Sequence, residues 1–309
     1  MLLKLNSHAV YLIAVFVFML ISCQGEIPRS MDQNTAVKAY YVSNNGDDSN
    51  DGTINRPWKN ISKIKNLILH AGDSVLFAGG QIFNGTVFIN HNTMGSPGQP
   101  IVISSYGAGV ATVASANETG IVINNCSYIQ LQNIKVIGSG RKDGNTTNGI
   151  GIFYSKSINL ENIDISGYQK SGLLIRNCSD MVVKNVYAHD NGYAGIAVDG
   201  ESLAKTDCRN IEINNCKAEN NPGDPTRLNN HSGNGIIVSQ CTNLKISHCI
   251  ATNNGWDMPR KGNGPVGIWA WEADSVTIEH CLSYRNKTSA GGEDGGGFDF
   301  DGGITNINS

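Results

Sequence analysis

The sequence has little charge and none of the motifs of a zinc site. Charged residues make up 16% of its 309 positions, the formal net charge is -3, and no run of like charges occurs. A chain without a basic patch attracts nucleic acid only weakly, so we expect no nucleic-acid partner. Cys-x-x-Cys and paired Cys/His spacings are missing as well, which argues against zinc. Glycine, by contrast, is abundant, with 36 residues.

Glycine marks the start of a repeat. Copies begin at Gly120, Gly149, Gly172, Gly195, Gly235 and Gly267, and an unfinished copy begins at Gly297. Gly149, Gly172 and Gly195 follow one another at intervals of 23 residues, and a fixed period of that length predicts a stacked repeat architecture. Within a copy the apolar residues alternate, as Ile121 and Ile123 do, which is the period of a β-strand.

The runs between turn residues are too short to hold the crossover helix that joins parallel strands in other folds. The leucine spacing of a leucine-rich horseshoe is also missing. A single coil could not bury its apolar face, whereas stacked coils bury theirs in one continuous core. The sequence therefore predicts an all-β protein whose single elongated domain is a parallel β-helix.

Equivalent positions of the copies carry the same polar residue. The ladder positions are Asn133, Asn162, Asn185 and Asn215, followed by His248 and His280. Stacked Asn side chains satisfy the backbone groups of a turn, and Asn tolerates left-handed backbone conformations. We therefore expect structural rather than catalytic roles for the two His.

Six of the eight Cys recur at regular places. Cys126, Cys178 and Cys241 each lie six residues after a coil-opening Gly, and Cys216, Cys249 and Cys281 replace inward apolar residues of other copies. Buried small apolar side chains explain this pattern better than disulfides or metal ligands do. Cys208 fits neither series.

The first 22 residues have the features of a secretory signal. Lys4 precedes an apolar run over residues 9–21, which ends in Leu-Ile-Ser-Cys. That ending resembles a bacterial lipobox and implies that Cys23 is lipidated, as in a membrane-anchored lipoprotein of the periplasm or cell surface. The run is short for a bilayer-spanning helix, which argues against an uncleaved anchor. We expect a signal peptide at 1–22, a tether at 23–38 and the β-helix domain at 39–309.

The stretch Y-Y-V-S-N-N-G-D-D-S-N-D-G-T at 40–53, the following Pro-Trp pair and G-D-S-V-L-F at 72–77 resemble right-handed parallel β-helix proteins of the pectate-lyase superfamily. The resemblance covers residues 39–309 and implies secretion and action on, or binding to, polysaccharide. The spacing of Ile61, Ile64, Leu67 and Ile68 predicts a short helix that caps the N-terminal end of the core. The last copy stops before its next strand, so we expect a truncated C-terminal end.

The alternation also predicts which side chains leave the core. If the residue after each Gly points inward, the second and fourth residues point outward in two rows. The first row is Val122, Gly151, Leu174, Ala197, Ile237, Trp269 and Asp299, and the second is Asn124, Phe153, Arg176, Asp199, Ser239, Trp271 and Asp301. Insertions at 138–148, 219–234, 253–266 and 286–296 precede coil-opening Gly residues, and insertions on a repeat array mark its binding face.

Outward Trp side chains favour contact with sugars, whose rings have apolar faces that stack on aromatic rings. A loop that covers both Trp is the alternative. The candidate substrate-binding residues are Trp269, Trp271, Asp199, Arg227, His231 and Trp256. We expect a monomer with a polysaccharide substrate.

A polysaccharide lyase is the first interpretation. In such an enzyme, acids or calcium neutralise a uronate carboxylate, and a Lys or Arg removes the α-proton; the candidate bases are Arg176, Lys261 and Lys287. The segment E-D-G-G-G-F-D-F-D at 293–301 resembles the D-D-G-F-D calcium motif of one lyase family, with Gly in place of its Asp pair. The resemblance implies a calcium site at Asp294, Asp299 and Asp301.

A glycoside hydrolase that uses Asp299 and Asp301 is the second interpretation. Their Cα atoms would lie about 6.6 Å apart on one strand, a spacing that suits both inverting and retaining pairs. The polygalacturonase signatures N-T-D, G-H-G and R-I-K are absent. The third interpretation is a non-catalytic glycan-binding or adhesion protein, which would keep the Trp stripe but need no acid or base.

Overall fold

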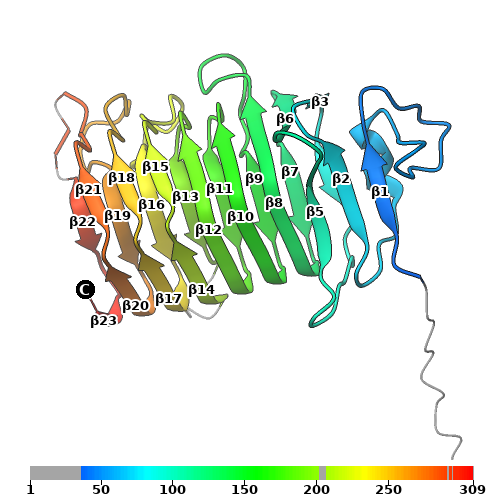
Figure 1. Ribbon diagram of the computed structural model, residues 1–309. Helices are drawn as coiled ribbons and strands as arrows, with labels where there is room; N and C mark the ends of the chain where they lie inside the picture. The colour runs from blue at the N-terminus through cyan, green and yellow to red at the C-terminus, as the bar shows by residue number, and fades with distance from the viewer. Residues whose placement is uncertain (1–35, 202–206, 291, 294, 309) are drawn as a thin grey trace, which may run out of the picture. The chain divides into compact units, whose positions relative to one another are not determined.

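The computed structural model describes residues 36–201, 207–290, 292–293 and 295–308. The described residues from Val37 onward form one compact unit, in which parallel strands stack coil upon coil (Figure 1). Two residues with predicted roles, Cys23 and Asp294, lie outside the described residues. Among the described residues, no helix has the length and apolar character needed to cross a membrane.

The larger sheet has fifteen strands. Its main path is β1 (Ala39–Val42), β2 (Ser74–Ala78), β5 (Ile101–Tyr106), β8 (Ser127–Gly138), β10 (Lys156–Ser166), β12 (Ser179–His189), β14 (Cys208–Asn214), β17 (Cys241–Ser247), β20 (Asp274–Glu279) and β23 (Thr305–Asn308). Its other strands are β3 (Ile82–Asn84), β6 (Ala111–Ala116), β15 (Lys217–Glu219), β18 (Ile250–Thr252) and β21 (Leu282–Tyr284).

The second sheet has eight strands and carries the copies that open with Gly. In spatial order it runs β4 (Val87–Ile89), β7 (Ile121–Asn124), β9 (Ile150–Phe153), β11 (Ser171–Arg176), β13 (Ala194–Asp199), β16 (Asn234–Ser239), β19 (Val266–Trp271) and β22 (Gly296–Phe300). Neighbouring strands pair in parallel, and each comes from the next coil of the chain. The predicted all-β parallel β-helix is confirmed.

The core lies between the two sheets. Inward side chains such as Ile121, Ile123 and Leu131 are fully buried, while alternate residues of β7 are partly exposed. Strand β16 is buried on both faces, because loops cover its outer side. The period of two therefore sets the inner face, and the loops decide how much of the outer face meets solvent.

The predicted Asn ladder is confirmed. Asn162 donates to Asn133 at 3.1 Å, Asn185 to Asn162 at 2.9 Å, and Asn215 to Asn185 at 2.7 Å. Their φ angles lie between 51° and 55°, in the left-handed region that Asn tolerates. His248 and His280 continue the column as rings stacked 5.0 Å apart, also with positive φ.

The seven Cys of the described chain are free thiols, and all but Cys281 are buried. The predicted role as small apolar core residues is confirmed for the regularly placed Cys, of which Cys281 is only partly buried. Cys208 lies opposite Cys241 in the strand register, so it belongs to the column that starts at Cys126. An insertion between Gly200 and Cys208 hides this relationship in the sequence, because it breaks the spacing of six.

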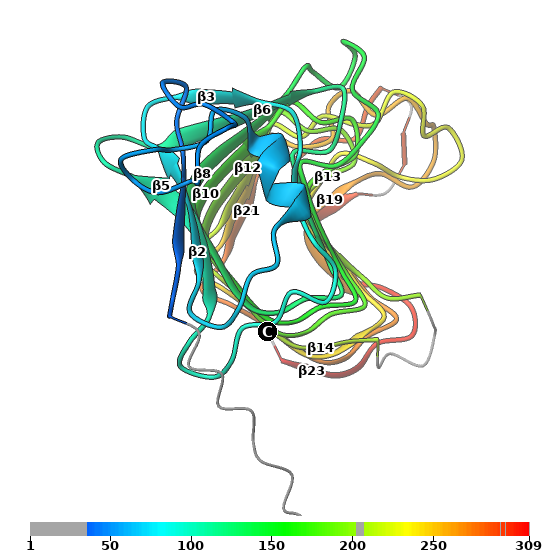
Figure 2. The same ribbon diagram turned by 90° about the vertical axis from the view of Figure 1, so that its right-hand side faces the viewer.

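The N-terminal helix is shorter than the apolar spacing predicts. It is a 3₁₀ turn, η1 (Ile61–Asn66), which buries Ile61 and Ile64 against the core. Ile68 lies beyond it and is 72% exposed, so the predicted extension over Leu67 and Ile68 is wrong. Viewed along the stack, the helix lies across the N-terminal end of the coils (Figure 2).

Candidate functional site

The outer face of the eight-stranded sheet carries the two predicted rows in register. Val122 pairs with Gly151, Gly151 with Leu174, Leu174 with Ala197, Ala197 with Ile237, Ile237 with Trp269, and Trp269 with Asp299. In the second row Arg176 pairs with Asp199, and Ser239 pairs with Trp271. Residues from seven consecutive coils therefore share one face.

Loops convert part of this face into a second apolar layer. Its members are Leu174, Ala194, Ala197, Ile237, Val266 and Trp269, with Phe153, Tyr193 and Trp271 packed against them. Trp269 is only 5% exposed, so a loop does cover this ring. Trp271, one row further along β19, keeps part of its surface in solvent.

Asn234 holds the covered Trp in place. Its Oδ1 accepts hydrogen bonds from Trp269 Nε1 at 3.1 Å and from the Val266 backbone N–H at 3.2 Å. Its Nδ2 lies 3.3 Å from the Tyr193 carbonyl oxygen and 3.2 Å from His231 Nδ1. A single buried amide thus joins two long loops to the floor strand.

A pocket of about 270 Å³ opens at the C-terminal end of this face. It is lined by Asn230, His231, Arg260, Asn263, Gly264, Val266, Trp269, Trp271, Gly295, Asp299 and Asp301. Two carboxylates, one cation, one imidazole and a partly exposed indole therefore meet in one hollow. The Gly302 backbone N–H donates to Asp301 Oδ1 at 2.6 Å.

His231 is neutral in this pocket at physiological pH. Its ring lies edge-on to Trp269, with centroids 4.8 Å apart. Burial, together with the positive charges of Arg227 and Arg260 and against the opposing charge of Asp301, lowers the pKa of His231 to about 4. The neutral imidazole can accept a hydrogen bond, but its low pKa makes it a weak base.

A second pocket of about 320 Å³ lies next to the first, and Trp271 lines both. Its lining is Asn148, Lys170, Ser171, Leu174, Arg176, Tyr193, Ala197, Val198, Asp199, Arg227, Ile237, Ser239 and Trp271. Arg176 Nη2 lies 2.5 Å from Asp199 Oδ2, and Ser239 Oγ donates to the other carboxylate oxygen at 3.2 Å. The two pockets form one groove across the outer rows.

The groove contains most of the predicted residues. Asp299, Asp301, His231, Trp269 and Trp271 line the first pocket, and Arg176, Asp199 and Arg227 line the second together with Trp271. Lys261, Lys287 and Trp256 line neither pocket. Trp256 instead donates to Asn220 at 3.0 Å and lies 5.9 Å from the Arg141 guanidinium.

Sequence reasoning missed Asn148, Lys170, Tyr193 and Asn234. Each lies one or two residues before a coil-opening Gly, at the corner where the insertions occur. Asn148 and Asn234 directly precede Gly149 and Gly235. That shared position was the signal that could have identified them.

Only two of the three predicted calcium ligands are among the described residues. Within the described residues, no group of three or more His, Cys, Asp or Glu side chains is arranged to hold a metal ion. Asp299 and Asp301 lie near each other, but the third expected ligand, Asp294, lies outside the described residues. The calcium site therefore stays a prediction.

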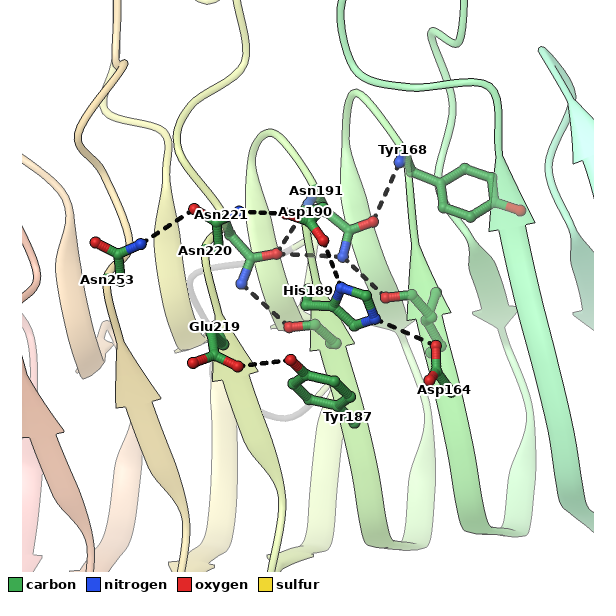
Figure 3. Close-up of polar contacts among 12 residues, drawn as sticks. Asp164, Tyr168, Tyr187, His189, Asp190, Asn191, Glu219, Asn220, Asn221 and Asn253 are labelled. Carbon is green, nitrogen blue, oxygen red and sulfur yellow. Dashed lines mark hydrogen bonds and ion pairs between the residues drawn. The ribbon is translucent and has the colours of Figure 1, made fainter.

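A separate polar cluster lies on the larger sheet (Figure 3), and its residues line neither pocket. His189 contacts Asp190 through Nδ1 at 2.5 Å and Asp164 through Nε2 at 3.3 Å, and Tyr187 stacks on it at 4.3 Å. Burial opposes a charge on the ring, but hydrogen bonds with both Asp outweigh it and raise the pKa of His189. The cluster ties neighbouring coils together by charge.

Near it runs a second Asn ladder that the sequence reading overlooked, buried at Asn191, Asn221 and Asn254 and partly buried at Asn286. Asn191 donates to Asn221 at 3.2 Å, Asn221 to Asn254 at 2.9 Å, and Asn254 to Asn286 at 2.8 Å. Each amide also donates to a backbone carbonyl of the preceding coil, as Asn221 does to Ala188 (Figure 3). These residues stabilise the turn that begins the groove corner.

The sequence is similar to a family of β-helix proteins and to part of a larger protein. Residues 75–225 match the family model described as "Right handed beta helix region". A lacto-N-biosidase of Bifidobacterium longum subsp. longum is 28% identical over 191 residues, which are 49% of this chain and 12% of that protein. This chain therefore matches only a small part of that relative.

Solved structures show the same architecture. The GH136 lacto-N-biosidase from Eubacterium ramulus superposes with a TM-score of 0.65 at 18% identity, over 87% of this chain and 56% of that one. A rhamnogalacturonan lyase has a TM-score of 0.52 at 21% identity, over 86% of this chain and 62% of that one. A pectate lyase has a TM-score of 0.50 at 17% identity, over 83% and 78%. At such identities the likeness concerns the fold, and this chain is a right-handed parallel β-helix protein.

Proposed function

We propose that this chain is a carbohydrate-active enzyme that hydrolyses a glycosidic bond in the groove. The observation that carries the proposal is the meeting of Asp299 and Asp301 with the partly exposed ring of Trp271 in one pocket. Glycoside hydrolysis needs two carboxyl groups on either side of the bond that breaks. An aromatic ring beside them can hold the apolar face of the sugar. The sequence match to a lacto-N-biosidase supports the same reaction class.

The two carboxyl groups divide the work between them. One donates a proton to the leaving oxygen, and the other activates water or attacks the anomeric carbon. Asp299 lies on β22, Asp301 directly follows it, and both line the same pocket. Rotation about their χ angles spans the separations of inverting and retaining enzymes. Arg260 and neutral His231 line the pocket beside them and can bind sugar hydroxyls.

A polysaccharide lyase is the second candidate, and the same pocket supports it. Lyase chemistry needs a cation against a uronate carboxylate and a base for the α-proton. Arg260 and neutral His231 could fill these roles, whereas Lys261 and Lys287 do not line the pocket. Arg176 is paired with Asp199, which makes it a poor base. Calcium held partly by Asp294 would belong to this alternative.

The test is an activity assay on a panel of neutral and acidic glycans, with calcium and with EDTA. Reducing ends and the ultraviolet absorbance of unsaturated uronates are followed together. New reducing ends without absorbance, lost in Asp299→Asn and Asp301→Asn, would support hydrolysis. A rise in both signals would replace the proposal with a lyase. Binding without turnover in wild type would leave the non-catalytic glycan-binding interpretation.

We also propose that the protein reaches its substrate as a monomer anchored through a lipid on Cys23, in the periplasm or at the cell surface. The signal-like N-terminus and the Leu-Ile-Ser-Cys sequence motivate this proposal. An anchored enzyme acts on glycans that arrive at or near a membrane surface.

A further inference from the structure

The second pocket has a different chemistry from the first. Three cationic side chains, Lys170, Arg176 and Arg227, line it around Tyr193. The Arg227 guanidinium lies over the Tyr193 ring, 4.5 Å from its centroid. Asn148, Ser171 and Ser239 add neutral hydrogen-bonding groups to the same lining.

Pairing leaves one of the three positive charges unbalanced. Lys170 Nζ lies 2.5 Å from Asp224 Oδ2, and Arg176 is paired with Asp199 as described above. Gln169 Nε2 also donates to fully buried Asp224, at 2.8 Å. Within the described part of the chain, Arg227 has no carboxylate within ion-pair distance. The pocket therefore carries a net charge of about +1 by this count of ionised groups.

In each of two guanidinium groups of this pocket, one N–H lacks a hydrogen-bond acceptor. The Nε atoms of Arg176 and Arg227 are buried and have no partner among the described residues. Both side chains nevertheless line the pocket, so their other N–H groups can face a ligand. Guanidinium groups bind the oxygen pairs of carboxylate and sulfate better than they bind single hydroxyls.

The distance between the two pockets defines how a glycan could fill both. The cationic pocket centres on β11, β13 and β16. Asp299 lies on β22, three strands beyond β13, and Asp301 directly follows that strand. Adjacent strands are about 4.8 Å apart, so the separation is roughly 14 Å. A hexose residue is about as long as the spacing between neighbouring coils. Trp271 lines both pockets and so lies between them.

We propose that the Arg227 pocket binds an anionic group of the glycan, a carboxylate or a sulfate, a few sugar residues away from the bond that lies at Asp299 and Asp301. The substrate would then be an acidic oligosaccharide or polysaccharide that occupies both pockets and passes over Trp271. This assignment rests on the proposed function for its second half, the place of cleavage. The anion-binding half stands on the cationic lining alone.

The test is an array of uronate-bearing, sialylated and sulfated oligosaccharides, each printed beside its carboxyl-reduced or desulfated counterpart. The probe protein is Asp299→Asn, so that bound glycan is not turned over. It is compared with the same protein carrying Arg227→Gln or Arg285→Gln. Arg285 is the matched control, because its guanidinium also lies over a Tyr ring, 5.9 Å from the centroid of Tyr284, outside the groove.

We expect about tenfold or stronger preference for acidic members over their neutralised counterparts, as for a charge-assisted hydrogen bond. Arg227→Gln should abolish that preference and Arg285→Gln should keep it. If only the sulfated members bind more tightly than their desulfated counterparts, the bound anion is a sulfate. If only the uronate-bearing or sialylated members bind more tightly than their carboxyl-reduced counterparts, it is a carboxylate.

Equal binding of acidic and neutralised members, or a preference that survives Arg227→Gln, would overturn the inference. Hydrolysis of neutral glycans with no acidic preference would overturn the anion-site inference but leave the proposed function standing. An acidic preference without turnover by wild type would leave the anion site and remove the proposed function. No binding to any member would overturn both.

Discussion

Trp269 Nε1 donates to Asn234 Oδ1 at 3.1 Å. The two residues lie 35 positions apart in the sequence but on strands β16 and β19, which are neighbours in the sheet. The bond explains why one outward Trp is buried while Trp271 remains available. The same oxygen accepts the Val266 N–H, so the amide also fixes the start of β19. The shape of the groove floor therefore depends on Asn234, which itself lines neither pocket.

Asn234→Ala should destabilise the fold and loosen the groove. The change leaves Trp269 Nε1 and the Val266 N–H buried without an acceptor, and we expect a loss of about 2–4 kcal/mol in the free energy of unfolding. Urea denaturation measures it. Asn229→Ala, an exposed Asn in the same loop, is the control and should stay near wild type. Equal stability of the two variants would contradict the role given to Asn234.

Trp271→Ala should weaken glycan binding without unfolding the protein. The ring is partly exposed and lines both pockets, so its loss removes a stacking surface for sugar but little core. We expect about tenfold weaker binding, measured by calorimetry on any glycan that the wild type binds. A variant that binds as tightly as wild type would show that sugar does not pass over this ring.

His231 should make stability depend on pH in a defined window. Its pKa in the folded state is about 4, below the ordinary value of 6.5, so the unfolded state takes up the proton first as pH falls. The contribution of neutral His231 to the free energy of unfolding is therefore complete above about pH 6.5. It is lost as the pH falls from there to about 4. We expect His231→Gln to flatten that part of the curve of unfolding free energy against pH. Parallel curves for wild type and variant would refute the assignment.

The buried and the exposed Asn ladders should differ in what they contribute. Asn221→Ala removes hydrogen bonds to Asn191 and Asn254 in a fully buried column, and we expect a loss of about 2–4 kcal/mol. Asn185→Ala removes comparable contacts in an exposed column, where water replaces them, and should cost about 1 kcal/mol. Thermal denaturation of both variants checks the order, and the reverse order would contradict it.

Lipidation at Cys23 has a direct test. Cells that express the full chain and are fed labelled palmitate should label the protein, and Cys23→Ala should abolish the label and release the protein from the membrane fraction. Cys281→Ala, which alters a free thiol of the β-helix, is the control and should remain labelled. Labelling that survives Cys23→Ala would refute the anchor.

Residue order alone predicted the architecture, because side chains on a strand alternate with a period of two and copies of a repeat must stack in register. It predicted that Trp269 would pair with Asp299, that Asn133 to Asn215 would form a ladder, and that the Cys would be buried. Each follows from local spacing. The 3₁₀ turn at Ile61–Asn66 departed from expectation, since packing of Ile61 and Ile64 ended the helix before Leu67.

Tertiary structure decided the site. Which Trp is covered depends on Asn234, and which cation stays unpaired depends on Asp224 reaching Lys170 and Asp199 reaching Arg176. These partners come from loops and strands on different coils, and their meeting depends on how irregular insertions pack. A periodic pattern specifies the scaffold because every coil repeats the same contacts, whereas the insertions are unique and their contacts follow no period.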